Sequence, residues 1–88
     1  MTQAAEIICY IQPVTAQAAG TAWVDTAKTA TVRRTVSNKG EAMQVIAEAK
    51  EIAAAITGKM IVKTMSRAIV GTRRPAGVKA LQGSQVVA

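Results

Sequence analysis

Positive charge is concentrated in the last third of this sequence, and positively charged side chains are those that bind phosphate. The chain has 88 residues and a formal net charge of +6. Its last acidic residue is Glu51, and the whole net charge comes from the six cations that follow it: Lys59, Lys63, Arg67, Arg73, Arg74 and Lys79. Lysines and arginines that neutralise the phosphates of a nucleic acid release its condensed counterions. Binding of this kind does not require a particular base sequence. The charge distribution therefore favours contact with nucleic acid.

Residues for catalysis or for metal binding are scarce. The sequence has no histidine, one cysteine and five acidic residues. Cys-His catalysis is therefore excluded, and one thiol with scattered carboxylates cannot build the usual zinc sites. Cys9 lies inside an apolar run, which is typical of a small buried side chain rather than of a nucleophile. We expect neither an enzyme nor a metal or other cofactor.

The clearest structural element is a helix over residues 38–57. Asn38 can act as the N-cap with Glu41 three positions on, a capping-box arrangement, and Gly58 can end the helix. Apolar residues recur at spacings of three and four, which predicts one packed face. The opposite side is wet and acidic: Glu41, Gln44, Glu48 and Glu51.

The rest of the chain predicts short strands. Runs rich in valine, isoleucine and threonine suggest strands at 7–12, 21–26, 30–36, 59–65 and 67–72. Pro13 would end the first strand, residues 14–20 would form a loop, and the last two strands would turn at Met65-Ser66. The element order is β-β-β-α-β-β. We predict an α+β fold, a small antiparallel sheet with one amphipathic helix packed on one face.

The chain predicts one domain, residues 1–72, followed by a flexible basic tail, residues 73–88. The tail contains Pro75 and two glycines and shows no clear period. An alternative is that its apolar end, residues 86–88, docks as a short strand or hook on a neighbour.

Alternation along strands indicates where the cations point. Arg33 shares a strand face with Thr31 and Thr35, whereas Arg34 falls on the apolar side near the strand end. Arg34 then lies in an interface or acts as a solvated charge at the sheet edge. A face that carries the basic residues would form a continuous track for phosphates: Arg33, Arg34, Lys63, Arg67, Arg73, Arg74 and Lys79.

Two aromatic side chains, Trp23 and Tyr10, are candidates for stacking on bases, as aromatics do in proteins that bind single strands. Trp23 is equally well interpreted as the largest residue of the core. The predicted helix presents glutamates, which do not suit the major groove, and no RNA-module pattern is present. We therefore expect single-stranded DNA in preference to duplex.

The alternative function is that of a protein-binding adaptor or inhibitor that acts on a host partner. In composition the chain resembles small accessory proteins of bacteriophages and mobile elements, which implies nucleic-acid binding or modulation of host machinery. The apolar content is mostly small side chains, so we expect a thin core and a homo-oligomer. No signal peptide or apolar span is evident, which predicts a cytoplasmic protein without a membrane partner.

Overall fold

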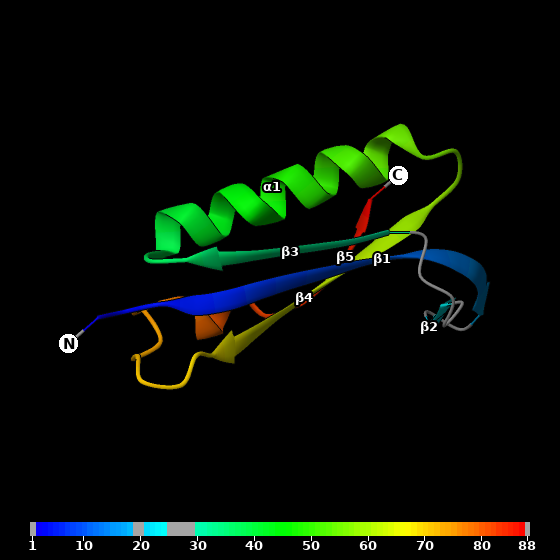
Figure 1. Ribbon diagram of the computed structural model, residues 1–88. Coiled ribbons are helices and arrows are strands. Elements are labelled where there is room, and N and C mark those ends of the chain that lie inside the picture. Colours follow the sequence, from blue (N-terminus) through cyan, green and yellow to red (C-terminus); the bar gives the residue numbers. More distant parts are fainter. Residues whose placement is uncertain (1, 19–20, 25–29, 88) are drawn as a thin grey trace.

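A computed structural model describes residues 2–18, 21–24 and 30–87 of the chain, with the backbone alone for 15–18 and 21–24. Figure 1 shows a sheet covered on one face by a single helix. The elements run in the order β1 (Ala5–Ala18), β2 (Thr21–Val24), β3 (Ala30–Val36), α1 (Lys39–Ala55), β4 (Met60–Ala68), a 3-10 turn η1 (Lys79–Leu81) and β5 (Gly83–Val87). The predicted α+β class is confirmed. The element order roughly fits the prediction, but the strand predicted over 67–72 does not form, and the last strand lies at Gly83–Val87 instead.

The sheet is antiparallel and is built around β1. Its strands lie in the order β3-β1-β4-β5, and β2 pairs with the later part of β1. Strands β3 and β4 both run antiparallel to β1, so the chain passes from one side of β1 to the other through α1. The four-stranded part of the sheet therefore ends in two edge strands, β3 and β5, and β2 lies at an edge beside the later part of β1.

The helix covers the face to which the odd-numbered residues of β1 point. Ile7, Cys9 and Ile11 have no exposed surface and pack in one cluster with residues of β3, β4 and α1. The helix contributes mainly small side chains to this cluster: Ala42, Val45, Ala49 and Ala53. The helix side of the core is therefore built mainly from alanine and valine.

The helix begins as predicted. The Oδ1 atom of Asn38 accepts a hydrogen bond of 2.8 Å from the backbone N–H of Glu41, and the Oε1 atom of Glu41 accepts one of 2.6 Å from the N–H of Ser37. These bonds satisfy donors that have no partner within the helix. The helix ends at Ala55, and Gly58 follows in a left-handed conformation with φ of +106°.

The first strand is longer than predicted. It continues through Pro13 to Ala18, where a loop was expected, and pairs there with β2. Proline is tolerated because the ladder between β1 and β3 has already ended at Ile11, so no strand on that side needs the missing N–H. The strand predicted over 21–26 is described only as far as Val24.

The predicted hairpin at Met65-Ser66 is wrong, because β4 continues through both residues to Ala68. Ser66 lies opposite Ile7 in the ladder with β1. On its other side, the N–H and the Oγ of Ser66 both donate to Oε1 of Gln82 at 3.0 Å. The glutamine thus extends the pairing of β4 beyond the end of β5, and a turn forms only after residue 68.

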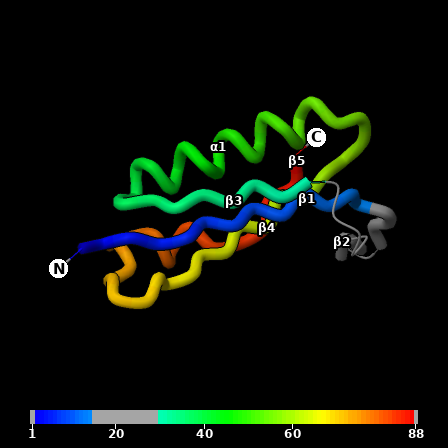
Figure 2. The backbone as a smooth tube through the Cα atoms, in the orientation of Figure 1, coloured from blue at the N-terminus to red at the C-terminus, as the bar shows by residue number. Residues whose placement is uncertain are grey.

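Residues 73–87 correct the expectation of a flexible tail. Val78 has no exposed surface and belongs to the core cluster, and β5 pairs with β4 from Gly83 to Val87. Figure 2 shows this segment running back along the sheet. The alternative prediction is correct in that a strand forms at the apolar end of the chain, but wrong in its partner, because this strand pairs with β4 of the same chain and not with a neighbour. Residues 73–87 are ordered because they contact residues that are distant in the sequence, and local composition does not reveal such contacts.

Candidate nucleic-acid interface

The face of the sheet opposite the helix carries the even-numbered residues of β1. Glu6, Ile8 and Tyr10 alternate with the core residues and so point to this second face, which we call the open face. Neighbouring strands place three cations beside them. Arg33 lies opposite Ile8, and Arg67 lies opposite Glu6.

Lys63 completes this group because it lies opposite Tyr10 in the ladder between β1 and β4. The partners of Lys63 and Arg67 on β1 are four residues apart, which corresponds to about 13 Å along the strand. The open face therefore collects Arg33, Lys63 and Arg67 with Tyr10, which are three of the seven cations of the predicted track and one of its two aromatic candidates. The side chains of Arg33 and Arg67 are 55% and 68% exposed, so solvent and ligands can reach them.

Glu6 lies between the two arginines. Its Oε2 is 4.0 Å from Nε of Arg33, and its Oε1 is 4.0 Å from Nη1 of Arg67. Exposed ion pairs of this kind contribute little to stability, about 0–1 kcal/mol. Their larger effect is to lower the local positive charge and to hold the two guanidinium groups on either side of one carboxylate.

Arg34 does not join this group. It lies opposite Ile7 and therefore on the helix side of the sheet. Its Nη2 donates a hydrogen bond of 3.1 Å to Oε1 of Glu48 on α1, and its Nη1 donates to the carbonyl of Arg33 at 2.9 Å. The predicted position on the apolar side is confirmed, and the residue closes the edge between β3 and the helix.

The three cations of the C-terminal segment occupy separate places. The N–H of Arg73 donates to the carbonyl of Thr2 at 3.1 Å, beyond the start of β1. Arg74 is half-buried, and its Nε is buried without a hydrogen-bond partner among the described residues. Lys79 begins η1 and is exposed. These residues are fixed by the packing of residues 73–87, not carried on a mobile tail.

The structure describes the side chain of Tyr10 but only the backbone of Trp23. Tyr10 is half-buried on the open face beside Lys63. The backbone of Trp23 lies in β2, opposite Ala16, but its side chain is outside the described part of the structure. Its stacking role stays a prediction.

Sequence reasoning missed two features of the open face. Glu6 was not recognised as its acidic centre, although alternation from Tyr10 through Ile8 would have placed it there. Ile8 and Ile61 are also buried, with 3% and 7% of their surface exposed, yet they lie outside the core cluster. The open face is therefore polar at its cations and apolar between them, with Met65 40% exposed beside Ile8.

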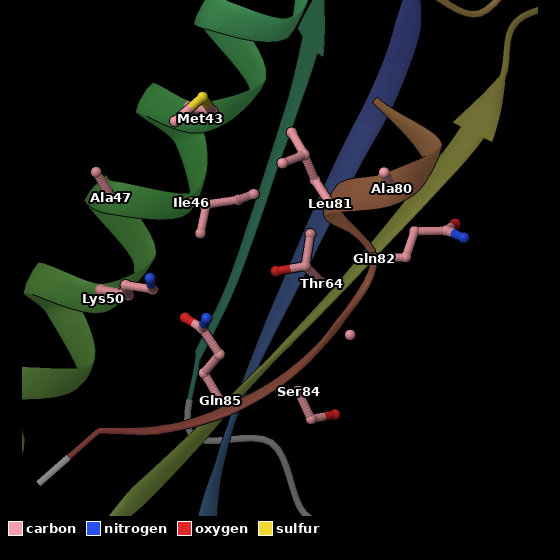
Figure 3. A pocket seen from close by; sticks show the side chains of 11 residues that line it. Met43, Ile46, Ala47, Lys50, Thr64, Ala80, Leu81, Gln82, Ser84 and Gln85 are labelled. Atoms are coloured by element: carbon pink, nitrogen blue, oxygen red, sulfur yellow. The ribbon is translucent and has the colours of Figure 1, made fainter. Parts of the chain in front are cut away.

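A groove of about 530 Å³ lies on the other side of the sheet, between α1 and the segment from η1 to β5 (Figure 3). Apolar side chains of α1 and η1 line one part of it, among them Met43, Ile46 and Leu81, and polar side chains such as Thr64 and Gln85 line the rest. Lys50 is the one charged side chain in its lining. With one cation against three on the open face, the groove is the weaker candidate for a polyanion.

Cys9 is buried beneath the helix, as predicted, with its Sγ 3.7 Å from Oγ1 of Thr64. Burial raises the pKa of the Cys9 thiol, the charge of Glu48 raises it further, and the hydrogen bond with Thr64 opposes both. A buried thiol with a raised pKa is a poor nucleophile. Within the described residues, no three acidic, cysteine or histidine side chains cluster as metal ligands would.

In the described ranges no helix has the length and apolarity that crossing a membrane requires. Comparison with protein-family models, with curated proteins and with solved structures gives no match to this chain. The functional interpretation therefore depends on the geometry and charge of the molecule itself.

Proposed function

We propose that the open face of the sheet binds single-stranded nucleic acid, with single-stranded DNA favoured over duplex, and that the protein performs no catalysis. The observation that carries the proposal is the convergence of Arg33, Lys63 and Arg67 with Tyr10 on the one face that α1 leaves uncovered. Among the described residues of β1, β3 and β4, three cations and one carboxylate give this face a net charge of +2.

Binding would depend mainly on phosphate contacts. Each cation that neutralises a phosphate of a single strand contributes about −0.7 to the slope of log affinity against log salt concentration. A base that stacks on Tyr10 would add about 1–3 kcal/mol. Glu6 holds the guanidinium groups of Arg33 and Arg67 on the open face, where the nucleic-acid backbone would pass. The phosphates would compete with Glu6 for these two groups.

A duplex suits this molecule less well. The helix that would enter a major groove has Glu41 and Glu51 exposed on its outer surface. A single strand can follow the open sheet face, where cations and an aromatic side chain alternate with apolar residues. Trp23 remains a proposed second stacking residue.

Arg33 and Arg34 provide a matched pair of variants for the test, because adjacent residues on one strand point to opposite faces. We expect Arg33→Gln to weaken binding of a labelled single-stranded oligonucleotide by about 3- to 10-fold and to reduce the salt slope by about 0.7. Arg34→Gln should change the affinity less than about twofold, since Arg34 is held by Glu48 on the other face. The measurement is fluorescence anisotropy at several salt concentrations.

Equal losses in the two variants would mean that binding follows net charge and does not use the open face. The thermal stability of both variants is measured as a control for folding. A Trp23→Ala variant, tested in the same way, should bind more weakly and lose any fluorescence response to the oligonucleotide. Normal binding by that variant would remove Trp23 from the interface.

The groove beside α1 favours a second candidate function, that of an adaptor or inhibitor that binds a host protein. Its lining combines apolar side chains, uncharged polar side chains and one lysine, which suits a partly apolar segment that carries a carboxylate. Failure of the wild-type protein to bind oligonucleotides at low salt, where electrostatic attraction is strongest, would place this function first.

A further inference from the structure

The two edges of the sheet differ in charge. Strand β3 carries Arg33 and Arg34, and the ion pair of Arg34 with Glu48 ties that edge to the helix. Strand β5 reads Gly-Ser-Gln-Val-Val, with neither a charge nor a proline. An edge strand presents unpaired N–H and C=O groups, and proteins usually protect such edges with charges, prolines or bulges. Edge β5 has none of these protections.

We propose that β5 is a self-association edge, and that two copies of the chain pair through it as antiparallel strands related by a two-fold axis at Gln85. This pairing concerns the protein alone and does not depend on the proposed binding of nucleic acid. Two-fold pairing uses the same surface on both partners, so the sequence of β5 must be complementary to itself.

The sequence of β5 meets this requirement. An antiparallel register centred on Gln85 places Gly83 opposite Val87 of the partner subunit and Ser84 opposite Val86 of the partner subunit. Each pair joins a small residue to a larger one, and Gln85 meets the same amide in the second copy. The space beside Gly83 is open, because a Cβ built there would have no other atom within 4 Å. Neither pair opposes like charges.

The pairing would cover exposed apolar surface on the open face. Val86 is 54% exposed and lies opposite Ile61 of β4. In the proposed register the two copies of Val86 are diagonal neighbours, at about 7–8 Å between backbones, within reach of each other's side chains. Ile61 and Val86 of both copies would then form one continuous apolar strip across the joined edge.

The positions of the charged residues favour β5 over β3 as the edge through which two copies pair. A β3 pair centred on Arg33 would bring the arginines of two positively charged chains within about 5 Å of each other. Across paired β5 strands the nearest open-face cation is Lys63, opposite Ser84. The two copies of Lys63 would be three strand spacings apart, about 14 Å. This exceeds the screening length of about 8 Å at physiological salt. Among the cations of the open face, repulsion is therefore strong for a β3 pair and weak for a β5 pair, and Lys50 of α1 is the one cation that lines the groove beside Gln85 on the other face.

An axis perpendicular to the sheet would keep the two open faces on the same side. Arg33, Lys63 and Arg67 of both copies would then lie on one extended surface. Only this consequence depends on the proposed function, for which a dimer would offer a longer single strand twice the number of phosphate contacts.

The test is the mass of the protein in solution over a range of concentrations, measured by sedimentation equilibrium without nucleic acid. Edge pairing of five residues buries less than a standard interface, so we expect a reversible dimer that is favoured at high concentration. Val86→Lys should weaken the dimer at least about tenfold, because it places two ammonium groups close together at the axis. Val70→Lys adds the same charge at a position that is 100% exposed and distant in sequence from β5, and it should dimerise like the wild type.

A mixture of Val86→Lys and Val86→Glu chains should recover the dimer, since the opposite charges then meet across the edge. Because Val86 is largely exposed, both variants should fold, and circular dichroism checks this. A monomer at every concentration would overturn the proposal, as would a wild-type mass that Val86→Lys leaves unchanged. The Arg33 and Arg34 comparison decides the proposed function separately, because the mass measurement contains no nucleic acid.

Discussion

The two faces of one sheet, formed by alternate residues of the same strands, differ in their side chains and in what covers them. The helix-covered face presents Ile7, Cys9 and Ile11 to small residues of α1 and excludes water. The open face presents Glu6, Ile8 and Tyr10 among three cations from β3 and β4. One set of side chains thus forms the core, whereas the alternate set lies on the open face beside the exposed Arg33 and Arg67.

The largest expected effect separates the two faces by stability. Ile7→Ala should lower the free energy of unfolding by about 3–5 kcal/mol, because it removes a fully buried side chain and leaves a cavity. Ile8→Ala should cost about 1–2.5 kcal/mol, since only the burial of the lost methyl groups is forfeited and neighbouring long side chains or water can fill the space. Urea denaturation measures both values. Equal losses would show that the open face is packed like the core.

The reactivity of Cys9 tests whether the covered face is closed. Because burial raises its pKa, the thiol should react with a disulfide reagent more than about tenfold slower in the folded protein than in urea. The raised pKa favours the protonated thiol in the folded state. This contribution to stability is complete below the thiol's unfolded pKa and is lost as the pH rises through the folded value. In Cys9→Ala this alkaline loss should disappear, and an identical pH profile in the variant would contradict the assignment.

Loss of the helix cap should weaken the covered face more gently. Asn38→Ala removes the acceptor for the N–H of Glu41 and should cost about 1 kcal/mol. Asn38→Ser, which keeps an acceptor, should cost less. Thermal unfolding of the two variants provides the measurement, and oligonucleotide affinity at a temperature where both are folded should not change. A change in affinity would connect α1 to the binding face.

The smallest expected effect concerns the acidic centre of the open face. Glu6→Gln removes the carboxylate between Arg33 and Arg67 and should raise oligonucleotide affinity about 2- to 5-fold, while stability changes by less than about 1 kcal/mol. Glu51→Gln on the exposed side of α1 makes the same change in net charge and should have the smaller effect. Anisotropy titrations at matched salt compare them. A larger gain from Glu51→Gln would place the ligand away from the open face.

Local signals in the sequence were sufficient for part of this architecture. The cap at Asn38 and the apolar period predicted α1, and the alternation of valine and threonine predicted β3 with its observed bounds. The same alternation placed Arg33 and Arg34 on opposite faces. These features depend on residues within a few positions of one another, so local propensity and periodicity are sufficient to predict them.

Other features depended on partners that lie far away in the chain. The continuation of β4 through Ser66 needs the side chain of Gln82, and the order of residues 73–87 needs the place that the core offers to Val78. The sequence predicted a turn at Met65-Ser66 and a flexible tail at 73–88. In the tail, proline and glycine indicate flexibility, and only the tertiary contacts show that residues 73–87 are ordered.

By itself, the sequence determined the fold class, the helix, the localised positive charge and the separation of Arg33 from Arg34. Only the tertiary structure decided which cations meet, since strand register brings Lys63 to Tyr10 and Arg67 to Glu6. The tertiary structure also placed β5 at an edge of the sheet, where this strand carries no charge although the protein has a net charge of +6. The physical reason is that side-chain alternation is a local property of a strand, whereas register and edge position are set by packing between segments far apart in the sequence.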